Sequence, residues 1–160
     1  MPCSSVIASA GVFSPAAPTR MPNEMIIESW KSAKVVVPGL TGSPIKLNEV
    51  PEDTKAHPIV IFLHGCNGIN QDSIRWGEAL RKLGYITILL DSFAIPGRQS
   101  NCDGENKIRD AGGKAVEVKT LRANETRVAR EKIRTLHWAD DSNIFLMGHS
   151  EGGAGVVFTR

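Results

Sequence analysis

The chain has 160 residues, of which 41% are hydrophobic and 22% charged, and this composition is that of one globular domain rather than of a disordered chain. Its formal net charge is +2 with both signs mixed along the chain, so there is no dense basic block of the kind that binds nucleic acid. No apolar run approaches the roughly 18–20 residues that a membrane-spanning helix needs, so we expect neither a nucleic-acid nor a membrane partner.

The beginning of the chain differs in composition from the rest. Residues 1–20 are rich in Ala, Ser and Pro and contain no acidic side chain. They also lack the basic segment with which a secretory signal peptide begins. We therefore predict a disordered leader over residues 1–24 and a domain over residues 25–160. The compartment stays open, with a cytoplasmic location slightly favoured over a secreted or periplasmic one.

The chain then shows a regular series of predicted elements. Residues 25–56 indicate an irregular, β-rich lead-in with short strands at 35–37 and 45–50. Three apolar runs suit strands buried on both faces of a sheet, and two amphipathic helices lie between them. A long loop precedes the second helix, and a turn at 140–142 precedes the last strand. The strands are 58–63, 85–90 and 143–147; the helices are 72–83, capped by Asp72 or Ser73 and ended by Gly84, and 121–136; the loop is 92–114.

This alternation of strands and helices predicts an α/β fold with a mainly parallel sheet and helices on both of its faces. The second helix includes the most basic stretch of the chain. Residues 122–134 hold four Arg and one Lys with two Glu interleaved. We interpret this stretch as a solvent-exposed helix face.

The last strand runs directly into the pattern Gly148-x-Ser150-x-Gly152. In a nucleophile elbow, a serine sits on a strained strand-to-helix turn that lifts its hydroxyl clear of the sheet. The start of the following helix also favours the negative charge that develops in a reaction. The alternative is a glycine-rich turn with an incidental serine. The apolar strand before Gly148 and the glycine-rich helix start after it favour Ser150 as a nucleophile.

A second glycine-rich segment, His64-Gly65-Cys66-Asn67-Gly68, follows the first buried strand. It lies at the carboxyl end of that strand, the edge of the sheet at which Ser150 is also expected. We interpret His64 as a structural hydrogen-bonding residue rather than as a catalytic base. Cys66 is expected to be half-buried, with its backbone more important than its thiol.

These two segments together resemble the α/β-hydrolase superfamily over about residues 57–160. The resemblance lies in residues 62–68 (Phe-Leu-His-Gly-Cys-Asn-Gly) and 148–153 (Gly-His-Ser-Glu-Gly-Gly). Within the superfamily the chain is most similar to dienelactone hydrolase-like proteins. Residues 91–93 (Asp-Ser-Phe), followed by Gly97, Arg98 and Cys102, are also similar to that group.

The resemblance implies a hydrolase that cleaves a small ester, lactone or related acyl substrate without a metal or an organic cofactor. Ser150 would attack the carbonyl, and the backbone N–H groups of Cys66 and Glu151 would form the oxyanion hole. The dienelactone hydrolases that name the group use a cysteine as nucleophile, so the serine here points toward general esterase chemistry. The residues expected to contact substrate are His64, Gly65 and Asn67.

The resemblance also implies partners for Ser150 that the sequence does not contain. In this superfamily an acid and then a histidine follow the serine along the chain, and residues 151–160 contain no His and no Asp. Among the four histidines, only His64 is both at the right edge of the sheet and separate from the elbow. We therefore hypothesise that the chain is a fragment, an α/β-hydrolase domain truncated at its C-terminus. The alternative is a catalytically inactive α/β-hydrolase domain that binds ligands or partners; a nucleotide-binding domain is disfavoured because no phosphate-binding glycine loop follows the first buried strand.

Two further features of the long loop bear on the site. Arg98 is a candidate to bind a substrate carboxylate, with a solvated loop charge as the alternative. The three cysteines, Cys3, Cys66 and Cys102, have no zinc-ligand spacing, so no metal site is expected. Cys66 and Cys102 follow neighbouring strands and could approach each other, but the odd number of cysteines and the open compartment weigh against a disulfide.

Overall fold

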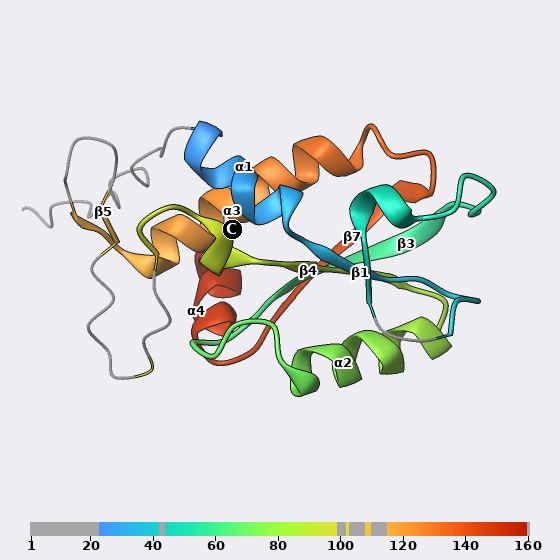
Figure 1. Ribbon diagram of the computed structural model, residues 1–160, viewed down its shortest axis with the longest axis horizontal. Coiled ribbons are helices and arrows are strands. Elements are labelled where there is room, and N and C mark those ends of the chain that lie inside the picture. The colour runs from blue at the N-terminus through green and yellow to red at the C-terminus, as the bar shows by residue number, and fades with distance from the viewer. Residues whose placement is uncertain (1–22, 42–43, 99–101, 103–107, 110–114, 160) are drawn as a thin grey trace, which may run out of the picture.

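The computed structural model describes residues 23–41, 44–98, 102, 108–109 and 115–159, so the predicted leader lies almost wholly outside the described residues. Five strands form one sheet in the order β2–β1–β4–β3–β7, and β5 and β6 form a separate antiparallel pair (Figure 1). The strands are β1 Lys34–Val36, β2 Ile45–Lys46, β3 His57–Leu63, β4 Ile86–Leu90, β5 Ile108–Arg109, β6 Ala115–Val116 and β7 Ala139–Gly148.

The predicted α/β class is confirmed, but the prediction of a mainly parallel sheet is wrong, because the sheet is mixed. β3 is parallel to β4 and to β7, whereas β1 is antiparallel to both β2 and β4. Parallel neighbours need a crossover of about a dozen residues or more, and only residues 37–44 connect β1 to β2. That connection is long enough only for antiparallel pairing.

Helices cover both faces of the sheet (Figure 1). On one face, Ile59 and Ile61 of β3 pack in a core cluster that also contains Ile133 of α3. On the other face, Phe62 of β3 packs with Ile74 of α2. The two-residue period of the strands therefore separates two layers of core. The helices are α1 Asn23–Lys31, α2 Gln71–Lys82, α3 Val118–Ile133 and α4 Glu151–Phe158.

The cap of α2 differs from the one predicted. Asn70 precedes the helix, and its side-chain oxygen accepts hydrogen bonds from the N–H groups of Asp72 and Ser73, both at 3.1 Å. Asparagine is among the preferred N-cap residues. The helix ends before Gly84, which adopts a φ of +87°, as the glycine at this position predicted.

The lead-in contains a helix, α1, where an irregular β-rich segment was expected. Ile26 and Ser29 lie three positions apart on this helix and are both buried. The predicted strand at 45–50 is also shorter than expected, because a 3₁₀ helix, Leu47–Glu49, follows β2 directly. Its last residue, Glu49, accepts a hydrogen bond from the N–H of Lys46 at 2.8 Å.

Strand β7 lies at one edge of the sheet and carries a bulge. Pro58 of β3 pairs with Asp140, but the next residue, Ile59, pairs with Ile144, so the intervening part of β7 leaves the ladder. The bulge coincides with the turn predicted at 140–142. The edge position leaves Phe145 49% exposed, so β7 is not buried on both faces as its apolar sequence predicted.

The predicted long loop at 92–114 contains short elements. It begins with a 3₁₀ helix, η2 Ser92–Ala94, and includes β5, while β6 follows it directly. None of the helices in the described ranges is long and apolar enough to cross a membrane.

Candidate active site

Ser150 occupies a sharp turn between the end of β7 and the start of α4. Its φ of 53° and ψ of −118° make it the one non-glycine residue with a positive φ in the described part of the chain. Such a conformation is strained for a residue with a side chain, and it persists only where the surroundings fix it. Here the N–H of His149 donates to the carbonyl oxygen of Leu63 at 3.1 Å, and that of Gly152 donates to the carbonyl oxygen of His149 at 2.9 Å. The turn is therefore tied both to β3 and to itself.

The two glycines of the pattern are required by close backbone approach. A Cβ atom at Gly148 would lie 2.4 Å from the carbonyl oxygen of Gly152. A Cβ atom at Gly152 would lie only 2.0 Å from the carbonyl oxygen of Leu63. Both separations are far inside van der Waals contact, so no larger residue fits without a backbone shift. The spacing of the two glycines around Ser150 thus has a steric cause.

The loop after β3 lies against this turn. A Cβ atom at Gly65 would lie 3.3 Å from both the Ser150 Cβ and the His149 carbonyl oxygen. The N–H of Gly68 donates to the carbonyl oxygen of Gly65 at 3.1 Å and closes the loop. The expected neighbourhood of Ser150 and the loop that contains Cys66 is therefore present in the structure.

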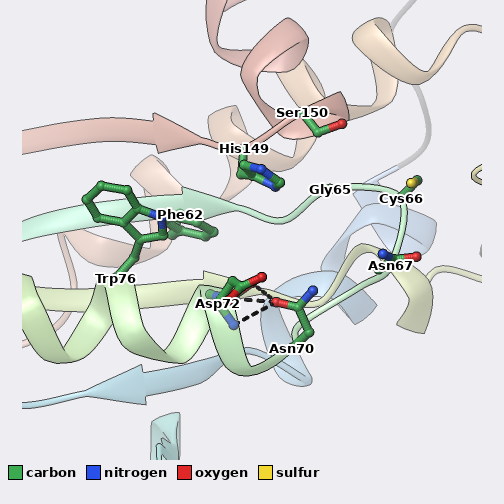
Figure 2. Close-up of a pocket in the computed structure, with 10 residues that line it drawn as sticks. Phe62, Gly65, Cys66, Asn67, Asn70, Asp72, Trp76, His149 and Ser150 are labelled. Atoms are coloured by element: carbon green, nitrogen blue, oxygen red, sulfur yellow. Dashed lines mark hydrogen bonds between the residues drawn. The ribbon is translucent and has the colours of Figure 1, made fainter.

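A cavity of about 130 Å³ opens beside Ser150, between the loop after β3 and the start of α2 (Figure 2). Three predicted site residues line it together with Ser150: Gly65, Cys66 and Asn67. The remaining part of the lining was not predicted from the sequence. Its signal was the position of the α2 N-terminus at the carboxyl edge of β3. These residues are Phe62, Asn70, Asp72, Ser73, Trp76 and His149.

His64 is buried behind the cavity and does not line it. Its Nε2 accepts a hydrogen bond from the Ser92 N–H at 3.1 Å, so the proton of the neutral ring belongs on Nδ1, which donates to the Gly65 carbonyl oxygen at 2.7 Å. Burial, with the positive charge of Arg122 as the next contribution, lowers the pKa of His64 to about 3. His64 therefore joins the ends of β3 and β4 as a neutral residue, and both of its ring nitrogens are occupied.

The other histidines are not hydrogen-bonded to the Ser150 hydroxyl either. His57 begins β3 and its Nδ1 lies 3.0 Å from the Gly84 carbonyl oxygen, while His137 precedes β7, so both are at the opposite edge of the sheet. His149 lines the cavity next to Ser150 and makes no side-chain hydrogen bond to a described residue. No histidine within the described residues is thus in place as a general base.

Arg122 is buried, although it belongs to the stretch that was interpreted as a solvent-exposed helix face. The side chains of Arg122 and Glu125 have no accessible surface, and Arg122 Nη1 donates to Glu125 Oε2 at 3.1 Å. Arg122 Nη2 donates to the carbonyl oxygen of His64. Helix α4 packs over this part of α3, and a Cβ atom at Gly155 would lie 2.5 Å from the Arg122 Cβ. The prediction was wrong here because it did not place α4 on α3.

Arg98 is also buried, and its guanidinium forms an ion pair with the carboxylate of Glu151. Arg122 Nη2 reaches the same Glu151 oxygen at 3.4 Å. Burial and the neighbouring charge of Arg122 lower the pKa of Arg98, whereas Glu151 opposes that change. Arg98 is therefore not a solvated loop charge, and it does not line the cavity beside Ser150.

A disulfide joins Cys66 to Cys102, 36 residues away. From the sequence these two residues were expected to be able to approach each other, but a disulfide between them was disfavoured. The bond attaches the loop after β3 to the segment that follows β4, the segment in which Arg98 lies.

Comparison with protein-family models and with curated proteins gives no match to this chain. In the described part of the chain, no group of three or more His, Cys, Asp or Glu side chains could hold a metal ion. The assignment of a function therefore depends on the geometry around Ser150.

Proposed function

We propose that this chain carries the nucleophile and the oxyanion loop of a serine hydrolase with an α/β-hydrolase fold, similar to dienelactone hydrolase-like proteins. The observation that carries the proposal is the backbone of Ser150, with a φ of 53° and a ψ of −118° between a strand and a helix. Steric exclusion of side chains at Gly148 and Gly152 supports it further. An incidental serine in a glycine-rich turn has no need of a strained conformation.

The proposed reaction is acyl transfer from a small ester, lactone or related substrate. Ser150 Oγ attacks the carbonyl carbon, and the N–H groups of Cys66 and Glu151 stabilise the negative oxygen that forms. A cavity of about 130 Å³ is smaller than the roughly 300–1,000 Å³ of pockets that hold drug-sized ligands, which suits a short acyl group. Phe62 and Trp76 supply its apolar lining. Asn67, Asn70 and Asp72 also line the cavity, so its wall is mixed in polarity.

The proposed reaction also requires a general base, which the described residues do not identify. A serine hydroxyl is a weak nucleophile until a base takes its proton. In this superfamily the acid and the histidine follow the serine along the chain, and residues 151–159 contain neither Asp nor His. No described histidine is hydrogen-bonded to the Ser150 hydroxyl, and this observation favours one competing function, an α/β-hydrolase domain that binds a ligand or partner without turnover.

Labelling with a fluorophosphonate probe tests the proposal. We expect the chain to be labelled at Ser150, with labelling lost in Ser150→Ala and retained in Ser142→Ala, whose exposed serine lies in the β7 bulge. Far-UV circular dichroism establishes that each variant is folded. A folded chain that is not labelled, or that is labelled equally after Ser150→Ala, contradicts the hydrolase proposal, and the first of these outcomes supports the binding domain.

A further inference from the structure

Two groups that the proposed function places in the oxyanion hole are attached to one and the same segment, residues 92–98 and Cys102 after β4. Cys66 is joined to Cys102 by the disulfide. Glu151 is joined to Arg98 by a partly buried ion pair. The two attachment points, Arg98 and Cys102, are four positions apart in the sequence.

Packing adds a third contact between this segment and the loop after β3. The ring of Phe93 lies 2.9 Å from the position that a Cβ atom would take at Gly68, so the ring covers that glycine. The same ring lies 4.8 Å from the His64 ring, centroid to centroid, and Arg98 lies over it at 5.1 Å. Phe93 therefore contacts both the oxyanion loop and Arg98, the residue whose charge holds Glu151.

The loop that carries Cys66 needs such an external restraint. Gly65 precedes Cys66, and Gly68, with a φ of +73°, follows shortly after, so two residues without side chains leave the backbone wide conformational freedom. On its strand side the loop is held by the His64 Nδ1–H bond to the Gly65 carbonyl oxygen. The disulfide is the covalent restraint on Cys66 itself, the residue whose N–H direction matters.

We infer that the segment after β4 braces the oxyanion hole, with Arg98 and Cys102 as positioning residues, so that opening the Cys66–Cys102 disulfide slows acyl transfer without weakening substrate binding. This inference rests on the proposed function. Oxyanion donors act on the charge of the transition state and little on the bound substrate, so displacing one lowers kcat and leaves KM nearly unchanged. Complete loss of one donor costs about 100- to 1000-fold in kcat, and a displaced donor is expected to cost about 10- to 100-fold.

The reaction that opens the brace is thiol–disulfide exchange with a dithiol such as dithiothreitol. The S–S bond between Cys66 and Cys102 breaks, and each sulfur gains one electron and one proton. The reductant loses two electrons and two protons and closes its own disulfide. Disulfides of this kind persist in oxidising compartments, so the braced form is the one expected there.

The test is carried out in a Cys3→Ser background, so that Cys66 and Cys102 are the only cysteines left. Hydrolysis of p-nitrophenyl acetate is measured before reduction, after dithiothreitol and after reoxidation. We expect reduction to lower kcat about 10- to 100-fold with KM within about twofold, and reoxidation to restore it. Cys102→Ser should show the low kcat from the start and should not respond to dithiothreitol. Glu151→Gln, which keeps the backbone N–H but loses the ion pair, should also lower kcat.

A kcat that reduction leaves unchanged overturns the inference, as does an equal effect of dithiothreitol on Cys102→Ser. A rise in KM at constant kcat also overturns it, because the disulfide would then shape the cavity instead. The backbone amide resonances of Cys66 and Glu151 in ¹⁵N NMR spectra separate this inference from the proposed function. If both resonances shift or broaden on reduction while Gly84 stays unchanged, the brace is supported even in a chain without hydrolase activity. If neither changes, it is overturned.

Discussion

The steric requirement at Gly152 predicts a large difference between two adjacent substitutions in α4. In Gly152→Ala the new Cβ would meet the Leu63 carbonyl oxygen at 2.0 Å and the His64 carbonyl oxygen at 2.8 Å. Both contacts are to backbone atoms at the end of β3, which cannot rotate away as a flexible side chain can. The start of α4 must therefore move away from β3.

The magnitude follows from comparison with Gly153→Ala. At Gly153 the nearest atom to a new Cβ is the Gly148 carbonyl oxygen at 3.4 Å, which is ordinary contact. We expect Gly153→Ala to leave stability unchanged or to raise it by about 0.5–1 kcal/mol, because alanine favours the helix. Overpacking costs about 1–3 kcal/mol or more, so we expect Gly152→Ala to lower the free energy of unfolding by about 2–3 kcal/mol.

Urea unfolding followed by tryptophan fluorescence and circular dichroism measures this difference. With a slope of about 2 kcal/mol per molar urea, the two variants should differ by about 1.5 M in the midpoint of unfolding. Equal slopes are needed for the comparison, because a changed slope signals a changed unfolded or native state. If the two midpoints coincide, Gly152 does not lie against the end of β3 and the steric account of the elbow is wrong.

Three further predictions concern buried groups and caps. The pKa of His64 is lowered to about 3, so between about pH 6.5 and pH 3 the unfolded chain binds a proton that the folded chain does not. The free energy of unfolding should therefore decrease as the pH is lowered through this window, by about 2 kcal/mol at pH 5. Urea unfolding at pH 7 and pH 5 should show a smaller loss of unfolding free energy in His64→Asn and the full loss in His137→Asn, whose histidine is exposed. The same loss in His64→Asn as in the unmodified chain would contradict the assignment to His64. Asn70→Ala should lower the free energy of unfolding by about 1 kcal/mol, because the α2 helix loses its N-cap. A midpoint of unfolding equal to that of the unmodified chain would refute this role of Asn70. Arg122→Met should lower the free energy of unfolding by about 3–5 kcal/mol, because it leaves Glu125 buried without its partner. The double variant with Glu125→Met should recover much of this loss. Calorimetric midpoints that show no recovery would refute the pairing.

Local patterns predicted the parallel part of the sheet and the helices α2 and α3. Strand β3 was recognised from its continuous apolar run, and α2 from its periodicity and from Gly84. Strand direction and sheet edges depend on pairing between distant segments, which a local pattern does not contain. For that reason the antiparallel β1 and the edge position of β7 were not predicted. Helix α1 did have a signal in the spacing of its buried residues, but the segment was interpreted as strand-rich.

The candidate site also has parts that the sequence predicted and parts that it did not. Ser150 and the loop that contains Cys66 were found because glycine patterns report local backbone geometry. The pairing of Arg98 with Glu151 was not found, because 53 positions separate the two residues and each reads as an ordinary surface charge. The disulfide between Cys66 and Cys102 was underestimated for a related reason, since a cysteine count carries no information on which sulfurs meet.

The features that break the general rules of protein sequences gather around one turn. Four such residues lie at the carboxyl edge of β3, β4 and β7 or in the segments packed against it. They are a serine with a positive φ, the buried neutral His64, and the buried arginines Arg98 and Arg122. A strained backbone costs free energy, and a buried ion pair is often no more stable than an apolar replacement. Natural proteins concentrate such exceptions at functional sites. A fold that needed only to be stable would have no reason to place Glu151 against two buried arginines directly after a strained serine. The cluster is explained if the position of the Glu151 backbone, rather than its charge, is what the surrounding groups maintain.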